Sequence, residues 1–424
     1  MNLFFTKQLK TIELYSLPIA AFFVLISTSA FNTFIILALI IGTFRIVYEK
    51  DYNNKISKKF MLYGILIFIF LVLSSYYTTS DFENAVITLK KYVKLLYIPI
   101  LFYYIKFYKN HIIIIKFLIS GSMIILLLSY LQFFSILDFS LINKFAGFDL
   151  FRTMDKASVF QTSIIHGVVF SLISFITMYL AIKLSKGYVI YPSHSIFNKS
   201  KFYFIYSFLC FCNVIWMNDS RNAYIISFFL ILLLIIRFFR KKKYAVTTVS
   251  LFLVFSLSIS EISETIFLKT IKEGYDDITL LKKDGNFSSS IGLRSIWAIN
   301  GVNNITEKPL FGSGVGSYKS TIKNFLENKN VKVDKNLAIS NNPHNEYVSI
   351  STQLGMFGLS LYLLFMYSLF KETRRNFLAI GVFIVTFVSS IFNSAFYDNV
   401  LGLFIVLSIS LFYQKFFSEK RQYD

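Results

Sequence analysis

Long apolar stretches separated by short polar connections make up most of this chain. Each stretch approaches the length of a helix that crosses a bilayer, roughly 17 to 25 residues, and exceeds the length of a barrel strand. The pattern predicts an all-α integral membrane protein with about twelve transmembrane helices. We place these helices at residues 14–30, 31–48, 60–77, 87–105, 112–134, 160–184, 202–217, 222–236, 244–260, 346–370, 377–392 and 400–413.

One long polar stretch, residues 261–343, interrupts this pattern between the ninth and tenth predicted spans. Within it, apolar residues recur at three- and four-residue spacing over 291–300, which indicates a helix. We expect a lid of a few short helices that is too small for a core of its own. The predicted organisation is therefore nine spans in 1–260, a large helical loop in 261–343 and three spans in 344–424.

Composition supports a membrane protein, and the charge distribution gives it an orientation. The chain is 55% hydrophobic and only 16% charged, unlike a soluble protein of 424 residues. The net charge of +20 does not indicate nucleic-acid binding, because the basic residues lie in short clusters between apolar stretches. With both termini in the cytoplasm, these clusters obey the positive-inside rule. The short connections on the other side contain Lys144, Arg152, Lys156 and Arg221, and the loop 261–343 is predicted to face the same outer side.

The most informative polar residue lies where this loop re-enters an apolar stretch. Proline is favoured at the first helical position, which predicts Asn342 as N-cap, Pro343 as the first helical residue and His344 as the second. A helix N-terminus is electropositive and attracts anions. His344 is therefore predicted to be a neutral base beside an anion site. The alternative is an ordinary polar residue at a helix start.

Two arginines are candidates for that anion site. Arg221 lies in a tight outer turn between two spans, and Arg294 lies on the predicted loop helix, so both share the outer face with His344. The planar guanidinium group is suited to bidentate phosphate binding. Lipid anchoring for Arg221 and a solvated loop position for Arg294 are the alternatives.

Other polar residues give weaker signals. Lys91 and Lys94 share a helix face at the outer end of the fourth span, where they could bind a lipid-linked diphosphate or extend to the headgroups. His166 is interpreted as a packed core residue, and the cysteines Cys210 and Cys212 likewise. No His and Cys spacing of a known metal site is present, so no metal is predicted. The alternating glycines of 312–316 indicate close backbone packing or a phosphate contact, and we interpret them as a structural turn.

Taken together, these motifs resemble the O-antigen ligase family of membrane glycosyltransferases, which is related to the O-antigen polymerases and to some protein O-oligosaccharyltransferases. The resemblance rests on the motif residues Pro343-His344-Asn345-Glu346-Tyr347, Gly355-Met356-Phe357-Gly358, Arg294 with Trp297, Glu307-Lys308-Pro309-Leu310-Phe311-Gly312-Ser313-Gly314, and Ser220-Arg221.

The resemblance implies an enzyme of the bacterial inner membrane whose active site faces the periplasm. It would transfer polysaccharide from undecaprenyl diphosphate to the lipid A-core of lipopolysaccharide, with no metal, nucleotide or other cofactor. His344 would activate the acceptor hydroxyl, while Arg221 and Arg294 would bind the diphosphate. We also assign Asn345, Lys91 and Lys94 to substrate binding.

Several other functions remain open at this level. A polymerase would use a second lipid-linked repeat unit as acceptor, and a protein O-oligosaccharyltransferase would use a protein. A transporter or flippase is disfavoured, because polar residues gather at one membrane face rather than at the midplane, and no pair of broken spans recurs in two halves.

Overall fold

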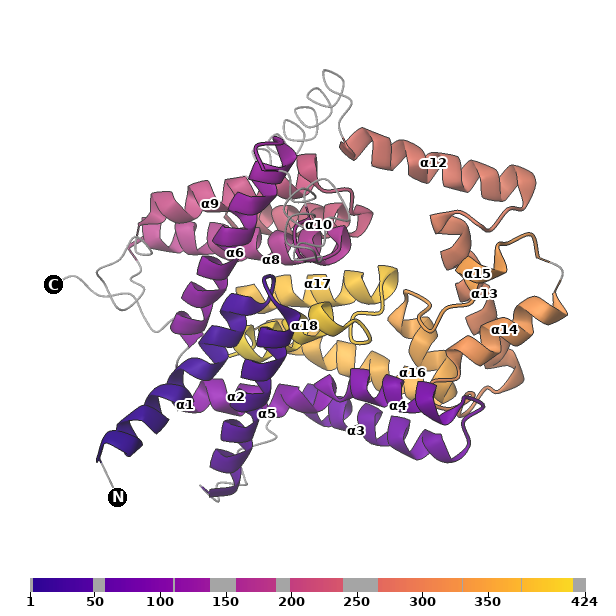
Figure 1. The fold of residues 1–424 in the computed structure, drawn as a ribbon, viewed down its shortest axis with the longest axis horizontal. Helices are drawn as coiled ribbons and strands as arrows, with labels where there is room; N and C mark the ends of the chain where they lie inside the picture. Colours follow the sequence, from indigo (N-terminus) through magenta and orange to yellow (C-terminus); the bar gives the residue numbers. More distant parts are fainter. Residues whose placement is uncertain are drawn as a thin grey trace. The chain divides into compact units, whose positions relative to one another are not determined.

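A computed structural model describes residues 3–48, 58–109, 111–137, 158–187, 199–238, 266–329, 331–374 and 376–414. The regular elements in these ranges are all helical (Figure 1). They form two compact units, each assembled from segments far apart in sequence. Unit 1 comprises Met1–Glu49, Leu101–Thr270 and Gln414–Asp424, and unit 2 comprises Lys50–Ile100 and Ile271–Tyr413.

Unit 1 contains α1 (Leu3–Phe23), α2 (Thr28–Tyr48), α6 (His111–Phe133), α8 (Ser163–Ser185), α9 (Ser200–Cys212), the π-helical turn η4 (Asn213–Met217) and α10 (Arg221–Phe238). Helix α8 is apolar on all sides and packs against α9 and α10. Helix α1 packs against α2 and α6. A helix that is hydrophobic all round is typical of a bundle interior in a membrane.

Unit 2 contains α3 (Lys59–Leu73), η2 (Ser74–Tyr76), α4 (Phe82–Tyr92), α13 (Ser290–Glu307), α14 (Tyr318–Asn328), α15 (Lys335–Ala338), α16 (Glu346–Thr373), α17 (Phe377–Phe392) and α18 (Asn399–Phe412). Helix α16 contacts α3, α13, α14 and α17, so elements from both ends of the sequence meet on it (Figure 1). Two helices, α5 (Lys94–Tyr108) and α12 (Ile266–Asp284), have residues in both units.

Within the described residues, seven helices are long and apolar enough to cross a membrane. They are Thr28–Val47, Lys59–Tyr76, His111–Phe133, Ser163–Ser185, Ser200–Met217, Arg221–Phe238 and Glu346–Thr373. Shorter apolar helices cover Thr11–Phe23, Phe377–Phe392 and Asn399–Phe412. The chain is a helical multi-pass membrane protein. The total of twelve spans stays a prediction, and the predicted span 244–260 lies outside the described residues.

The predicted span 87–105 is wrong as a single helix. The structure has α4 and α5 there, with Val93 between them. The Leu96 N–H donates to the Val93 carbonyl over three residues rather than four, which tightens the turn. Pro99 lies inside α5, lacks an N–H for the Leu95 carbonyl and crowds that carbonyl. The proline therefore distorts the helix one turn before its own position.

The stretch 261–343 is helical where it is described, and the helix predicted at 291–300 is confirmed as part of α13. The expectation that the stretch lacks a core is wrong. Residues from α13, α14 and α15 form one buried apolar cluster, against which Val348 of α16 packs. The buried members are Ile296, Trp297, Tyr318, Ile322, Phe325, Leu326 and Ala338.

Candidate active site

His344 lies just before α16, not inside its first turn as predicted. Helix α16 begins at Glu346, and its N-cap is Asn345, whose side chain accepts from the Val348 N–H at 3.0 Å. Asn342, predicted as the cap, instead accepts from the His344 N–H at 3.0 Å and closes a turn over Pro343. Asparagine is favoured both as a helix N-cap and in a turn that its side chain closes. Asn342 and Asn345, three residues apart, were therefore both suitable N-cap candidates.

The backbone of His344 has a φ of +50°, the left-handed region. This conformation is uncommon for a residue other than glycine and costs about 1–2 kcal/mol. It belongs to the turn that Asn342 closes just before α16. Strained residues of this kind gather at functional sites.

Hydrogen bonding fixes the tautomer of the His344 ring. Its Nδ1 lies 3.1 Å from Asn393 Oδ1, in the connection between α17 and α18. That Asn393 atom also accepts from the Ser394 N–H at 2.9 Å, which identifies it as the amide oxygen. Nδ1 must therefore carry the proton and donate it, so Nε2 holds the lone pair. Nε2 has no hydrogen-bond partner among the described residues.

The surroundings keep this imidazole neutral. Burial lowers the pKa of His344 below its ordinary value of 6.5, opposed by its bond to Asn393. The positive charge of Arg294 lowers the pKa of His344 further, whereas the negative charge of Asp398 raises it. A neutral imidazole with an accessible lone pair has the form that a general base requires.

Arg294 and Trp297 lie three residues apart on α13, and the structure brings them to His344. The Trp297 and His344 ring centroids are 5.3 Å apart with an interplanar angle of 33°. The Trp297 indole N–H donates to the Ala338 carbonyl at 2.8 Å, which fixes the ring. Arg294 Nη1 donates to Ser290 Oγ at 3.1 Å on the same helix. Half-buried Arg294 thus supplies a cation beside the candidate base.

The glycine stretch that follows α13 docks on α16 through backbone hydrogen bonds. The Ser313 and Gly314 N–H groups donate to the Thr352 and Gln353 carbonyls at 2.9 and 2.8 Å. In return, the Met356 N–H donates to the Pro309 carbonyl at 2.8 Å. The structure therefore uses these glycines for close backbone packing, the first of the two predicted interpretations.

This docking needs a break inside α16 at Gly355, where φ is +63° and ψ is −159°. A Cβ on Gly355 would lie 2.5 Å from the Leu310 carbonyl carbon, and one on Gly312 would lie 2.6 Å from the Gly355 nitrogen. Both positions therefore require glycine. The contact fixes the end of α13, and hence Arg294 and Trp297, relative to α16.

The structure separates the roles of the two predicted lysines. Lys94 is only 2% exposed, and its ammonium donates to the Asp398 carbonyl. Lys91 is half-buried, with its ammonium 3.7 Å from the Tyr397 ring centroid. Extension of Lys94 to the headgroups is therefore excluded by its burial. Both lysines pack against the connection that contains Asn393.

Asn345 has a structural role in addition to any contact with substrate. Its amide oxygen caps α16, and its Nδ2 donates to the Ile391 carbonyl at 2.9 Å. The side chain therefore joins α16 to the end of α17. Its predicted role in substrate binding stays a prediction.

Arg221 belongs to unit 1, where it is the first residue of α10. The Ser220 hydroxyl caps this helix by accepting from the Ala223 N–H at 3.3 Å, and Arg221 Nε donates to the Thr270 carbonyl at 3.2 Å. Arg294 and His344 belong to unit 2. The grouping of Arg221 with these two residues stays a prediction from topology.

Other histidines and cysteines have structural surroundings. His166 is 1% exposed, with Nε2 2.8 Å from Asn213 Oδ1, which confirms its interpretation as a core residue. Cys210 and Cys212 are buried and free. Among the described residues, no three His, Cys, Asp or Glu side chains gather where they could hold a metal ion.

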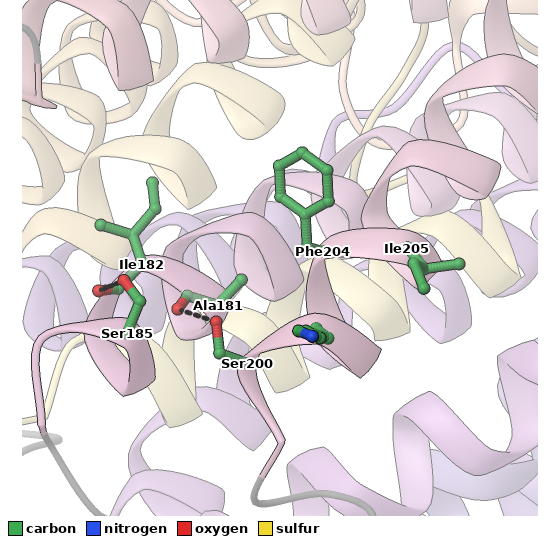
Figure 2. A pocket seen from close by; sticks show the side chains of 7 residues that line it. Ala181, Ile182, Ser185, Ser200, Phe204 and Ile205 are labelled. Carbon is green, nitrogen blue, oxygen red and sulfur yellow. Dashed lines mark hydrogen bonds between the residues drawn. The ribbon is translucent and has the colours of Figure 1, made fainter.

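A cavity of about 450 Å³ lies in unit 1, where the end of α8 meets the start of α9 (Figure 2). The hydroxyls nearest to it are already bonded, because Ser185 donates to Ile182 and Ser200 to Ala181. None of the candidate catalytic residues lines this cavity. Its lining is Ala181, Ile182, Ser185, Ser200, Lys201, Phe204 and Ile205.

Sequence reasoning missed two residues that shape the site. Asn393 fixes the His344 tautomer, and its only signal was a polar residue between two apolar spans. Glu346 was noted in the motif without a role, although an acidic residue at the start of an apolar helix is unusual.

The apolar helices define a multi-pass membrane protein, and His344 with its neighbouring cation forms a candidate enzyme site. A family model described as O-antigen ligase matches residues 205–363, which include Arg221, Arg294 and His344. This match confirms the resemblance to the O-antigen ligase family that the motifs indicate. The matched family implies glycosyltransferase-type activity on lipid-linked glycans in the bilayer. Comparison with curated proteins gives no match.

Proposed function

We propose that this protein transfers a glycan from undecaprenyl diphosphate to the lipid A-core of lipopolysaccharide at the periplasmic face of the inner membrane. The observation that carries the proposal is the state of His344. It is neutral, it has its proton on Nδ1 toward Asn393, and its Nε2 is available beside Arg294. Family membership of this segment supports the substrate class.

The proposed reaction is a direct displacement. The acceptor hydroxyl oxygen attacks the anomeric carbon while its proton passes to His344 Nε2. The bond from that carbon to the phosphate oxygen breaks, and its electron pair leaves with the lipid diphosphate. Arg294 would stabilise the negative charge that develops there, and the motif resemblance assigns the same role to Arg221.

The test is the transfer rate of the purified full-length protein with a lipid-linked donor and a core acceptor. We expect His344→Ala and His344→Gln to lose about 100- to 10,000-fold in rate, as removal of a positioned base does. Donor binding, measured separately, should be retained. His111→Gln is the matched control, because His111 begins α6 and belongs to none of the motifs that carry the family resemblance. Normal turnover in His344→Gln would exclude the base mechanism.

A deletion strain separates the ligase from its relatives. Loss of a ligase should leave free polymer on the lipid carrier and unsubstituted core on a lipopolysaccharide gel. Core that carries a single repeat unit would identify a polymerase instead. A normal gel with a missing protein glycan would identify transfer to protein.

A further inference from the structure

A group of buried polar residues lies immediately beyond His344 and has no part in the reaction proposed above. Glu346 is 0% exposed, Tyr92 1% and Lys94 2%. Burial of charged side chains is expensive unless they are paired and hydrogen-bonded. Tyr92 ends α4 and Lys94 begins α5, while Glu346 begins α16, so two segments distant in sequence meet here.

The Glu346 carboxylate is hydrogen-bonded at both oxygens. The Tyr92 hydroxyl donates to Oε1 at 2.5 Å, and the Phe396 N–H donates to Oε2 at 2.9 Å. The Tyr92 hydroxyl also lies 3.2 Å from Ser349 Oγ. One of the two carboxylate oxygens thus holds backbone of the connection between α17 and α18.

Lys94 holds the same connection from another side. Its ammonium donates to the Asp398 carbonyl, and its charge is opposite to those of Glu346 and Asp398. A Cβ on Gly402 would lie 2.9 Å from Lys94 Nζ, so the glycine leaves room for the ammonium. Lys94 and Glu346 therefore carry opposite charges in one buried region, and each holds one end of 396–398.

The other end of this connection contacts the candidate base. Asn393 accepts from His344 Nδ1, and the Ser394 hydroxyl donates to Asn342 Oδ1, beside the turn that orients His344. The segment 393–398 thus joins buried Lys94 and Glu346 to the imidazole.

We propose that Glu346 and Lys94, with Tyr92, are positioning residues that hold the segment 393–398 and thereby the orientation and tautomer of His344. This inference rests on the proposed function of His344 as the base. None of the three residues needs to touch the substrate. A displacement of the base by about 1 Å costs roughly 100-fold in rate, so a small shift of the segment is sufficient to matter.

The test compares kcat, donor KM and the pH dependence of kcat for Tyr92→Phe, Glu346→Gln, Lys94→Met and the Glu346→Gln/Lys94→Met double variant. Tyr362→Phe is the matched control, because this buried hydroxyl bonds Ser390 and its loss spares the segment. Rates are expressed per donor-binding protein, so unfolded material does not count. Tyr92→Phe is the mildest change, and it tests the positioning role even if a charge variant does not fold.

We expect each single variant to lose about 10- to 100-fold in kcat with donor KM within about twofold. The acid limb of the pH profile should move to higher pH, because a loosened His344 gains water and its pKa rises toward the ordinary value. Besides Asn393, the groups that face His344 are Arg294, Asp398 and the Trp297 ring, and none is substituted. The double variant should recover several-fold over Lys94→Met, since Glu346 is then no longer a buried carboxylate that has lost the nearby ammonium.

A purely structural role predicts a different result. All variants would then keep wild-type kcat per donor-binding protein and an unmoved acid limb, like Tyr362→Phe, and the inference would be overturned. The His344→Ala variant separates the base mechanism from the positioning role. An active His344→Ala protein refutes the base mechanism, whereas an inactive one beside fully active Tyr92→Phe and Glu346→Gln refutes only the positioning role.

Discussion

Substitution of Gly312 by alanine tests whether the docked glycine stretch holds unit 2 together. Gly312 has a φ of +68°, and a new Cβ would lie 2.6 Å from the Gly355 nitrogen and 2.7 Å from the Thr352 oxygen. These neighbours are backbone atoms, which cannot move aside as a side-chain tip can. The contact with them is also the place where Ser313 and Gly314 bond α16.

The magnitude follows from two separable costs. A left-handed backbone costs an alanine about 1–2 kcal/mol. Forcing a methyl group into a packed site adds about 1–3 kcal/mol. Gly312→Ala should therefore lower the free energy of unfolding by about 2–5 kcal/mol.

Gly285 provides the matched control. Its φ is +58°, yet a Cβ there meets no atom within 4 Å. Gly285→Ala should thus show the backbone cost alone. The assay is unfolding by SDS titration in mixed micelles, with the two variants in the same detergent. Equal losses of free energy in both variants would refute the role of the close backbone contact.

Three further predictions concern the site and its location. The rate of transfer should be constant above neutral pH and should fall on the acid side with a midpoint below pH 6.5. The reason is that the lowered pKa of His344 preserves the active neutral form to lower pH. A midpoint above pH 6.5 would contradict this environment of His344. Arg294→Lys and Arg221→Lys keep the charge but lose the planar fork, so both should transfer glycan much more slowly, and full activity of both would reduce these residues to charge or packing roles. Lys319 is exposed on α14, so Lys319→Cys should react with an impermeant maleimide in intact cells, and labelling only after the inner membrane is broken would reverse the predicted orientation.

The sequence predicts those features that depend on residues close together along the chain. The spacing of apolar residues identified α13, and the glycines of 312–316 were rightly assigned to a turn, because both features depend on short-range backbone preferences. Arg294 and His344 were placed together from topology, and the structure brings α13 to the start of α16.

The remaining features depend on partners that are distant in sequence. Asn342 and Asn345 are equivalent cap candidates by local rules, and Asn345 is selected because its Nδ2 also bonds Ile391. Similarly, the local sequence predicts that Lys94 could extend to the lipid headgroups. In the structure its ammonium instead donates to the carbonyl of Asp398, which is distant in sequence. No local pattern encodes such pairings.

The break in α16 has a consequence for how this membrane protein is made. A helix that crosses a bilayer normally satisfies its own backbone, because an unpaired polar group in lipid costs several kcal/mol. Helix α16 does not, since the Thr352 and Gln353 carbonyls and the Met356 N–H are bonded by the segment 309–314. That segment is synthesised earlier than α16. The backbone groups at the break are satisfied only when that segment has docked, so membrane insertion of α16 and folding of the preceding stretch are thermodynamically coupled.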